Sequence, residues 1–188
     1  MKKKNVSCNH CDSRSDSVFK CLDHEALDEL SEAKRTNLYK KGQILFYEGN
    51  MPYGVFCISE GVIKLYKTSL EGKQTIVRMA KPGDILGYRS LFSSQSYNAT
   101  GECLEDSRIC FTEKKVIYKL ITENPELALE IISKLSLQLG FAENMAHGMA
   151  YRSARERLAE LILLLNESFG EDANGIRRIN LKLTREEI

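Results

Sequence analysis

Six cysteines are the residues of this chain best suited to chemistry. Cys8 and Cys11 form a C-x-x-C pair in a polar N-terminal stretch, and Cys21 follows after nine intervening residues. Thiolates are the preferred ligands of iron–sulfur clusters, which usually need four of them. A C-x-x-C pair is also half of many zinc sites, which His10 or His24 could complete, and it is the form of a redox-active dithiol. Cysteines without any cofactor are the remaining alternative, and the spacing alone leaves all of these open.

The bulk composition indicates a soluble, cytoplasmic protein that does not enter a membrane. The chain has 188 residues, 43% of them hydrophobic and 28% charged, which is ordinary for a globular protein. No apolar run reaches the ~18 residues that cross a bilayer, and no apolar stretch of a secretory signal follows the basic start. Disulfides are rare in a reducing cytoplasm. The net charge of +1 is too small for a chain whose whole surface binds nucleic acid, so any DNA contact must be local or lie outside these residues.

Enzyme chemistry has little support in the sequence. The three histidines, His10, His24 and His147, are too few and too scattered for a catalytic triad. No nucleophile elbow, Walker loop or zincin pattern is present. We therefore expect no catalytic residues.

The elements that must position the cysteines follow from the hydrophobic pattern. Apolar side chains at helical spacing predict a short amphipathic helix over residues 22–36. From Asn37 to Lys115 the period becomes two and glycines recur about every ten residues, which predicts many short strands. These strands are expected at residues 44–47, 55–58, 62–66 and 75–79, with a hairpin at Glu71-Gly72. The pattern is typical of a barrel-like roll, although an unrelated β-sandwich would give it too.

Helices are expected after the strands. A helix over residues 113–122 precedes a longer one that opens at Asn124-Pro125, with Pro125 in the first helical position. The longer helix has a heptad-like apolar seam, which is best buried against a second copy of the chain; packing on its own domain is the alternative. The expected dimer interface consists of Leu135, Leu139, Ala142, Met145, Ala146 and Met149.

The last part of the chain predicts the beginning of a further domain. An apolar helix from Ala154 to Phe169 should end at Gly170, followed by a polar turn over residues 171–175 and a short strand over 179–183. Thr184 and Glu187 have capping-box spacing, so a new helix should start there. One helical turn is not stable alone, and the chain is therefore expected to be cut off at this point.

The order of these elements resembles the Crp/Fnr superfamily. The stretches that carry the resemblance are 41–49 (KGQILFYEG), 58–66 (ISEGVIKLY), 81–87 (KPGDILG), 154–159 (ARERLA) and 183–188 (LTREEI). The resemblance implies an α+β chain: a jelly-roll-like β-roll of the cyclic-nucleotide-binding type, a long dimerisation helix and the start of a winged helix-turn-helix. The implied parts are a cysteine-containing segment (1–21), a sensor roll (22–123), a dimerisation helix (124–152) and an incomplete DNA-binding domain (153–188).

The same resemblance implies a DNA-binding transcription regulator. Such a protein acts as a homodimer with DNA and RNA polymerase as partners, and its DNA-reading helix would lie beyond these residues, so no DNA-binding residue is expected here. A stand-alone regulatory module that uses the same roll without binding DNA is the alternative. The heptad-like helix and the continuation to Thr184 favour the regulator.

An effector pocket is implied within residues 87–100. Its candidate residues are Gly87, Tyr88, Arg89, Ser90, Tyr97 and Asn98. Relatives that bind cAMP carry Gly-Glu where this chain has Gly87-Tyr88, and Arg followed by Ser or Thr where it has Tyr97-Asn98. A phenol cannot replace a guanidinium against phosphate. We therefore do not expect cAMP as a cofactor, and we expect Tyr88, Phe92 and Tyr97 to fill the pocket.

The resemblance also suggests how a cluster could be completed. In the oxygen-sensing Fnr branch, a cysteine on a strand of the roll is the last ligand of a 4Fe–4S cluster, and residues 104–110 (LEDSRIC) resemble that stretch. The implied ligands are Cys8, Cys11, Cys21 and Cys110. The gap between Cys11 and Cys21 is longer than the five residues typical of that branch. Cys57, within an apolar strand, is interpreted as a core residue, and Cys103 fits either role.

Overall fold

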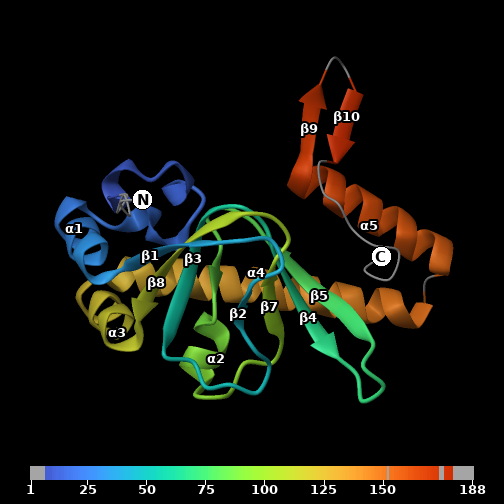
Figure 1. Ribbon diagram of the computed structural model, residues 1–188, viewed down its shortest axis with the longest axis horizontal. Helices are drawn as coiled ribbons and strands as arrows, with labels where there is room; N and C mark the ends of the chain where they lie inside the picture. Colours follow the sequence, from blue (N-terminus) through green and yellow to red (C-terminus); the bar gives the residue numbers. More distant parts are fainter. Residues whose placement is uncertain (1–6, 152, 174–175, 180–188) are drawn as a thin grey trace. The chain divides into compact units, whose positions relative to one another are not determined.

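Eight short strands in two antiparallel sheets form the centre of the structure, a computed structural model that describes residues 7–151, 153–173 and 176–179 (Figure 1). One sheet has the strand order β1-β8-β3-β6 and the other β2-β7-β4-β5. The strands are β1 (Arg35–Tyr39), β2 (Ile44–Phe46), β3 (Gly54–Glu60), β4 (Ile63–Thr68), β5 (Gln74–Ala80), β6 (Ile85–Leu86), β7 (Thr100–Cys103) and β8 (Ser107–Glu113). The expected roll and all four expected stretches of strand are confirmed.

The hydrophobic core of the roll is supplied by alternate residues of these strands. Ile58 of β3 and Ile63 of β4 are fully buried, and Ile109 of β8 is 1% exposed. They belong to one cluster with Phe46, Leu65, Leu86 and Tyr97. Burying one such apolar side chain stabilises the fold by about 1.5–3 kcal/mol. Because side chains alternate across a strand, the neighbours of Ile58 and Ile109 must face away from this core.

The expected hairpin joins β4 to β5. Gly72 lies in this turn with φ of +82°, a left-handed conformation that suits glycine because it has no Cβ. Its amide donates to the carbonyl of Ser69 over 2.9 Å, and the Ser69 amide donates to the carbonyl of Lys73 over 2.9 Å. The glycine that predicted a turn in the sequence is therefore the residue that adopts the left-handed conformation of that turn.

The helices of the described chain are α1 (His24–Ala33) before the strands of the roll, α2 (Tyr88–Ser93) between β6 and β7, and α3 (Lys114–Glu123), α4 (Pro125–Tyr151) and α5 (Ala154–Phe169) after β8 in the sequence. The side chain of Asp23 caps α1 by accepting from the amide of Ala26 over 2.9 Å. Pro125 opens α4 as expected.

The cysteine-containing N-terminal segment is folded onto the roll. Residues from Cys8 onward form three short 3-10 helices, η1 (Cys8–His10), η2 (Asp12–Arg14) and η3 (Val18–Cys21). Val18 and Phe19 are buried, although the sequence suggested little core in this segment. The segment packs against α1 and β3 (Figure 1), so it belongs structurally with the sensor roll.

The chain divides into two units, Met1–Ile132 and Ser133–Ile188, and the division falls inside α4. In the second unit, α5 ends at Phe169 as expected. The expected polar turn is wrong for residues 171–173, because β9 (Gly170–Ala173) pairs antiparallel with β10 (Ile176–Ile179), and residues 174–175 lie outside the described residues. The expected strand 179–183 overlaps β10 at Ile179 only, and its remainder lies outside the described residues, as do Thr184 and Glu187. None of the helices described is both long and apolar enough to span a membrane.

A candidate sensor cavity lined by four cysteines

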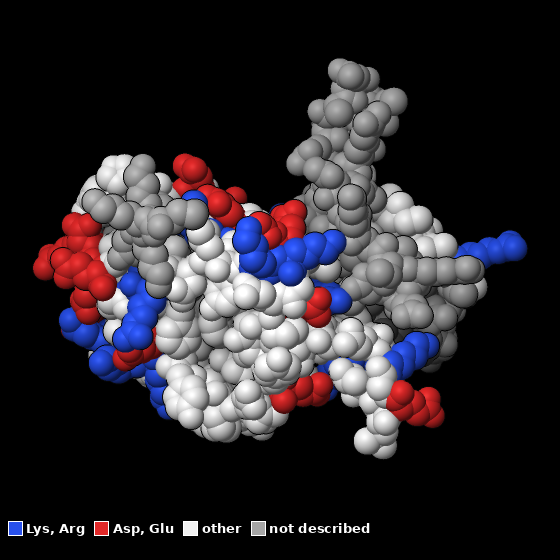
Figure 2. Space-filling view, viewed as in Figure 1, with Lys and Arg blue, Asp and Glu red and all other residues white. Residues whose placement is uncertain are grey.

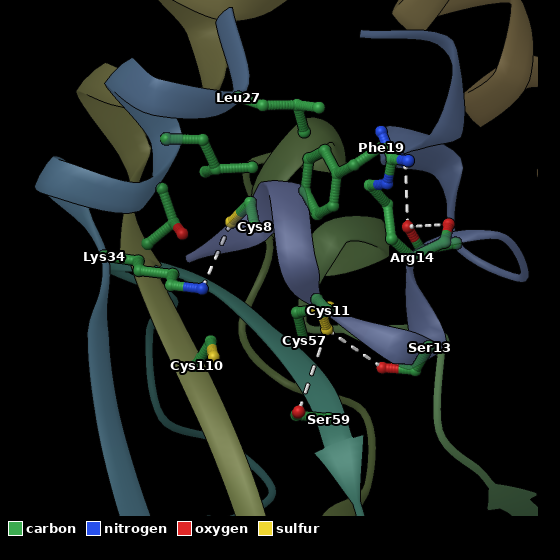
Figure 3. Close-up of a pocket in the computed structure, with 13 residues that line it drawn as sticks. Cys8, Cys11, Ser13, Arg14, Phe19, Leu27, Lys34, Cys57, Ser59 and Cys110 are labelled. Atoms are coloured by element: carbon green, nitrogen blue, oxygen red, sulfur yellow. Dashed lines mark hydrogen bonds between the residues drawn. The ribbon is translucent and has the colours of Figure 1, made fainter. Parts of the chain in front are cut away.

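Four of the six cysteines line one cavity between the N-terminal segment and the first sheet. They are Cys8 and Cys11 from the segment, Cys57 from β3 and Cys110 from β8. Figure 3 shows the four side chains around this space, with Lys34 beside them. We call it the cysteine cavity.

The sheet places two of these thiols side by side. Cys57 lies directly opposite Cys110 in the antiparallel register of β3 and β8, and opposed residues in such a pair project on the same face. Their neighbours Ile58 and Ile109 are buried in the core, so Cys57 and Cys110 project on the other face of the sheet. Ser59 and Thr112, each two residues further along its strand, also line the cavity, as this alternation requires.

The N-terminal segment covers this outer face. The amide of Cys8 donates to the hydroxyl of Ser31 over 2.7 Å, and that hydroxyl donates to the carbonyl of Leu27 in α1 over 2.7 Å. The Cys11 sulfur lies 3.3 Å from the Ser13 hydroxyl and 3.8 Å from the Ser59 hydroxyl. Backbone and side-chain contacts thus hold both ends of the C-x-x-C pair over the sheet.

Lys34 brings a positive charge into this apolar site. Only 5% of the residue is exposed, and its ammonium donates to the Cys8 sulfur over 3.1 Å. Burial opposes protonation, yet the neighbouring Cys110 and Cys8 sulfurs leave the pKa of Lys34 above its ordinary value. Arg14 also lines the cavity, whereas no Asp or Glu is among the described lining residues. Buried charges are costly unless paired, so the cavity favours a group with negative charge.

Burial keeps the two strand thiols in the neutral form. It raises the pKa of Cys57, and it raises the pKa of Cys110 against the opposing hydrogen bond from Thr36 and the charge of Lys34. Any metal group that took these thiols as ligands would have to release their protons. Loading of such a group would therefore depend on pH.

The structure brings together three of the four expected cluster ligands. Cys8, Cys11 and Cys110 line the cavity, and Cys21 does not. The Cys21 thiol instead donates to the carbonyl of Val18 over 3.3 Å, and burial raises its pKa. Cys103 is fully buried on β7, in the other sheet.

Cys57 is the residue that sequence reasoning missed. Phe56 and Ile58 on either side of it belong to the core, so the two-residue period could have placed Cys57 on the opposite face. The pattern gave no sign of which cysteines would lie across from it.

The alternative zinc ligands lie elsewhere. His10 and His24 are exposed and do not line the cavity. Among the described residues, no three Cys, His, Asp or Glu side chains converge closely enough to hold one metal ion. Because each thiolate of a four-iron cluster binds a different iron, cluster ligands are spread more widely than those of a single ion.

None of the expected effector residues is among the described residues that line the cysteine cavity. Tyr88 is 1% exposed, and Tyr97 is buried with its ring stacked on Phe46 at 4.2 Å between centroids. Arg89 and Asn98 are exposed. The remaining two have structural contacts: the Ser90 hydroxyl donates to the carbonyl of Ser96 over 3.0 Å, and Gly87 precedes α2 with φ of +83°.

Two further sequence expectations concern side chains of this region and of α4. Phe92 is partly buried and packs edge-on against Tyr118.

In the expected dimer seam, Leu135 is partly buried and Leu139 is exposed. Ala142, Met145 and Ala146 are exposed as well, and the side chain of Met149 lies outside the described residues.

Comparisons with known proteins agree with this architecture. A family model for the cyclic nucleotide-binding domain matches residues 36–124. Electron transport regulator A of Shewanella oneidensis is 26% identical over 97% of this chain and 73% of its own length. The nitrogen fixation regulation protein FixK of Bradyrhizobium diazoefficiens is 26% identical over 96% of this chain and 75% of its own. These matches agree with the resemblance to the Crp/Fnr superfamily.

Solved structures show the same fold for this chain. The catabolite activator protein of Thermus thermophilus has a TM-score of 0.64 at 24% identity, covering 80% of this chain and 71% of that one. The sensor domain of the transcriptional regulator DNR from Pseudomonas aeruginosa has a TM-score of 0.64 at 21% identity, covering 73% and 93% respectively. The relatives named in the preceding paragraph are regulators, in agreement with the expectation that this chain is not an enzyme.

The surface of the roll shows no broad basic field in the view of Figure 2, where Lys and Arg are interspersed with Asp and Glu. Acidic side chains gather at α1 (Figure 2), whose residues include Glu25, Asp28, Glu29 and Glu32.

Proposed function

We propose that this chain is the sensing and dimer-forming part of a bacterial transcription regulator, with the cysteine cavity as its sensor site. A relative from Vibrio cholerae, 25% identical over 97% of the chain, is a fumarate and nitrate reduction regulatory protein. A relative from Pasteurella multocida, 26% identical over 97%, is an anaerobic regulatory protein. These names favour oxygen or redox state as the signal.

An iron–sulfur cluster is the group we propose for the cavity. The single observation that carries this is four thiols around one cavity whose described lining has two cations and no carboxylate. Thiolates are the usual cluster ligands, and four of them outweigh the positive charge of a 4Fe–4S core, so the assembly is net negative. Lys34, 3.1 Å from the Cys8 sulfur, would offset part of that charge. When bound, such a cluster supplies sensitivity to oxygen and to electron transfer.

The ligands would couple the N-terminal segment to the roll. Cys8 and Cys11 belong to the segment, whereas Cys110 belongs to β8. A group bound by all three cysteines would therefore link the N-terminal segment to the roll. Lys20 of η3 pairs with Glu130 of α4 over 3.1 Å. The segment is therefore in direct contact with the beginning of the long helix, so a change in the position of the segment would act on α4. An exposed pair of this kind contributes at most about 1 kcal/mol, enough to bias an equilibrium but not to lock it.

The output would be promoter binding in the cytoplasm. We propose that α4 pairs with its copy in a homodimer, since Leu139 and Met145 of the seam are 61% and 42% exposed and an apolar seam is best buried in a symmetric contact. DNA and RNA polymerase are the partners we propose for the whole regulator. A stand-alone module without DNA binding is disfavoured, because α5 and the β9–β10 hairpin continue the chain beyond the long helix.

Metal analysis under anaerobic conditions tests the sensor. Protein purified without oxygen, or reconstituted with iron and sulfide, should be brown and should contain iron and acid-labile sulfide in equal amounts. Its visible charge-transfer absorbance should fade in air. A colourless, iron-free protein after anaerobic reconstitution would exclude the cluster.

A further inference from the structure

The position of the fourth thiol distinguishes two ligand sets for the proposed site. Cys8, Cys11 and Cys110 belong to both sets. Sequence spacing offers Cys21 as the fourth, but its thiol donates to the carbonyl of Val18 and does not line the cavity. Cys57 does line the cavity, opposite Cys110.

We infer that Cys57, rather than Cys21, supplies the fourth thiolate. This rests on the cluster proposed above. The cavity then has two ligands on a paired, hydrogen-bonded sheet and two on the short η1 turn and the residue after it. The sheet pair is fixed by strand register, whereas the other pair depends on the placement of the N-terminal segment. Loss of the bound group would therefore release the segment and leave the sheet unchanged.

Ser17 explains why a ligand from the sheet is needed. It stands five intervening residues after Cys11 and lines the cavity, but it carries a hydroxyl instead of a thiol. That hydroxyl donates to the carbonyl of Arg14 over 2.9 Å and accepts from the amide of Phe19 over 3.1 Å. It is thus committed to capping η3. The cavity needs a fourth soft ligand from another element, and Cys57 is the remaining thiol in its lining.

Changing each cysteine singly to serine tests the assignment, because the structure divides the six into four and two. The chain carrying Cys8→Ser, Cys11→Ser, Cys57→Ser or Cys110→Ser should retain less than about a tenth of the wild-type iron and sulfide after anaerobic reconstitution, since four thiolates are needed. Cys21→Ser and Cys103→Ser should retain the wild-type content. Cys103 is the matched control for a buried thiol, since it is fully buried in the other sheet.

A second measurement separates ligand loss from misfolding. Cys57→Ala and Cys103→Ala should both give cooperative thermal unfolding in the metal-free state, and only Cys57→Ala should lose iron. Alkylation followed by mass spectrometry should show Cys57 protected more than tenfold in the loaded wild-type chain relative to the stripped chain. Protection of Cys21 should be equal in the two states.

The outcomes separate this inference from the proposed function. If Cys57→Ala keeps its iron while Cys21→Ser loses it, the cluster stands and the Cys57 assignment is overturned. If the wild-type chain takes up neither iron nor sulfide, both are overturned.

Discussion

The ammonium of Lys34 lies 3.1 Å from the sulfur of Cys8, in a cavity with three further thiols and no carboxylate among its described lining residues. The raised pKa of Lys34 means that the folded site favours its charged form, and bound thiolates would pair with that charge in a charge-assisted hydrogen bond. Lys34 should therefore stabilise the loaded state more than the metal-free state.

Replacing Lys34 by methionine tests this difference. Lys34→Met keeps the aliphatic stem but removes the charge and the hydrogen bond to the Cys8 sulfur, so the free energy of unfolding of the metal-free chain should fall by about 1 kcal/mol. The loaded chain should lose iron several-fold faster to a chelator. Urea unfolding and chelator kinetics measure the two effects. Lys67→Met, at a side chain that is 53% exposed, is the control and should change stability by less than about 0.5 kcal/mol. An unchanged rate of iron loss in Lys34→Met would contradict a role for Lys34 beside the bound group.

Two turn glycines should differ in their tolerance of alanine. Both have positive φ, +92° at Gly61 and +82° at Gly72. A Cβ at Gly61 would lie 2.8 Å from Cα of Ser107, whereas one at Gly72 would meet nothing within 4 Å. Gly72→Ala should therefore lower the free energy of unfolding only by the cost of holding an alanine in the left-handed conformation, about 1–2 kcal/mol. Gly61→Ala should lower the free energy of unfolding by at least about 2 kcal/mol more than Gly72→Ala does, because the backbone at Ser107 would have to move. Equal unfolding midpoints for the two variants would contradict the close approach of β8 to Gly61.

Tyr97 should be required for the core rather than for nucleotide binding. Its ring stacks on Phe46, and burial raises its pKa to about 12. Tyr97→Ala should lower the free energy of unfolding by about 3–5 kcal/mol, as expected for truncating a buried aromatic side chain. Millimolar cAMP should leave the melting temperature of the wild-type chain unchanged. A saturable rise in melting temperature with cAMP would show that the nucleotide finds a site despite Tyr97.

Local patterns predicted individual strands, whereas the choice of a roll over an unrelated β-sandwich came from the resemblance to the Crp/Fnr superfamily. The two-residue period and the glycine turns predicted β2 to β5, because each strand exposes alternate side chains to the same core. The expectation failed at residues 171–173, where a four-residue strand, Gly170–Ala173, is too short and too polar for the alternation to be visible.

The sensor site was only partly predictable, because it depends on contacts between distant residues. Spacing identified Cys8 and Cys11, and resemblance identified Cys110. The pairing of Cys57 with Cys110 is a matter of register between β3 and β8, which the residues within either strand do not encode. Cys21 was favoured by cysteine count, but the hydrogen bond of its thiol to Val18 follows from how η3 ends, a detail that spacing does not reveal.

The proposed dimer predicts a contrast between two exposed leucines of α4. Leu139 is 61% exposed and lies in the heptad-like seam, whereas Leu137 is 74% exposed and lies on the opposite side of the helix from Leu139, since two helical residues are about 200° apart. Leu139→Glu would place a charge in a desolvated symmetric contact and should raise the dimer dissociation constant by about 10- to 100-fold, or roughly 1.4–2.7 kcal/mol. Leu137→Glu has the same charge and a similar starting exposure, so it should leave the constant within about threefold. Sedimentation equilibrium of both variants measures the difference. A monomeric wild-type chain, or equal weakening by the two substitutions, would rule out self-pairing through this seam.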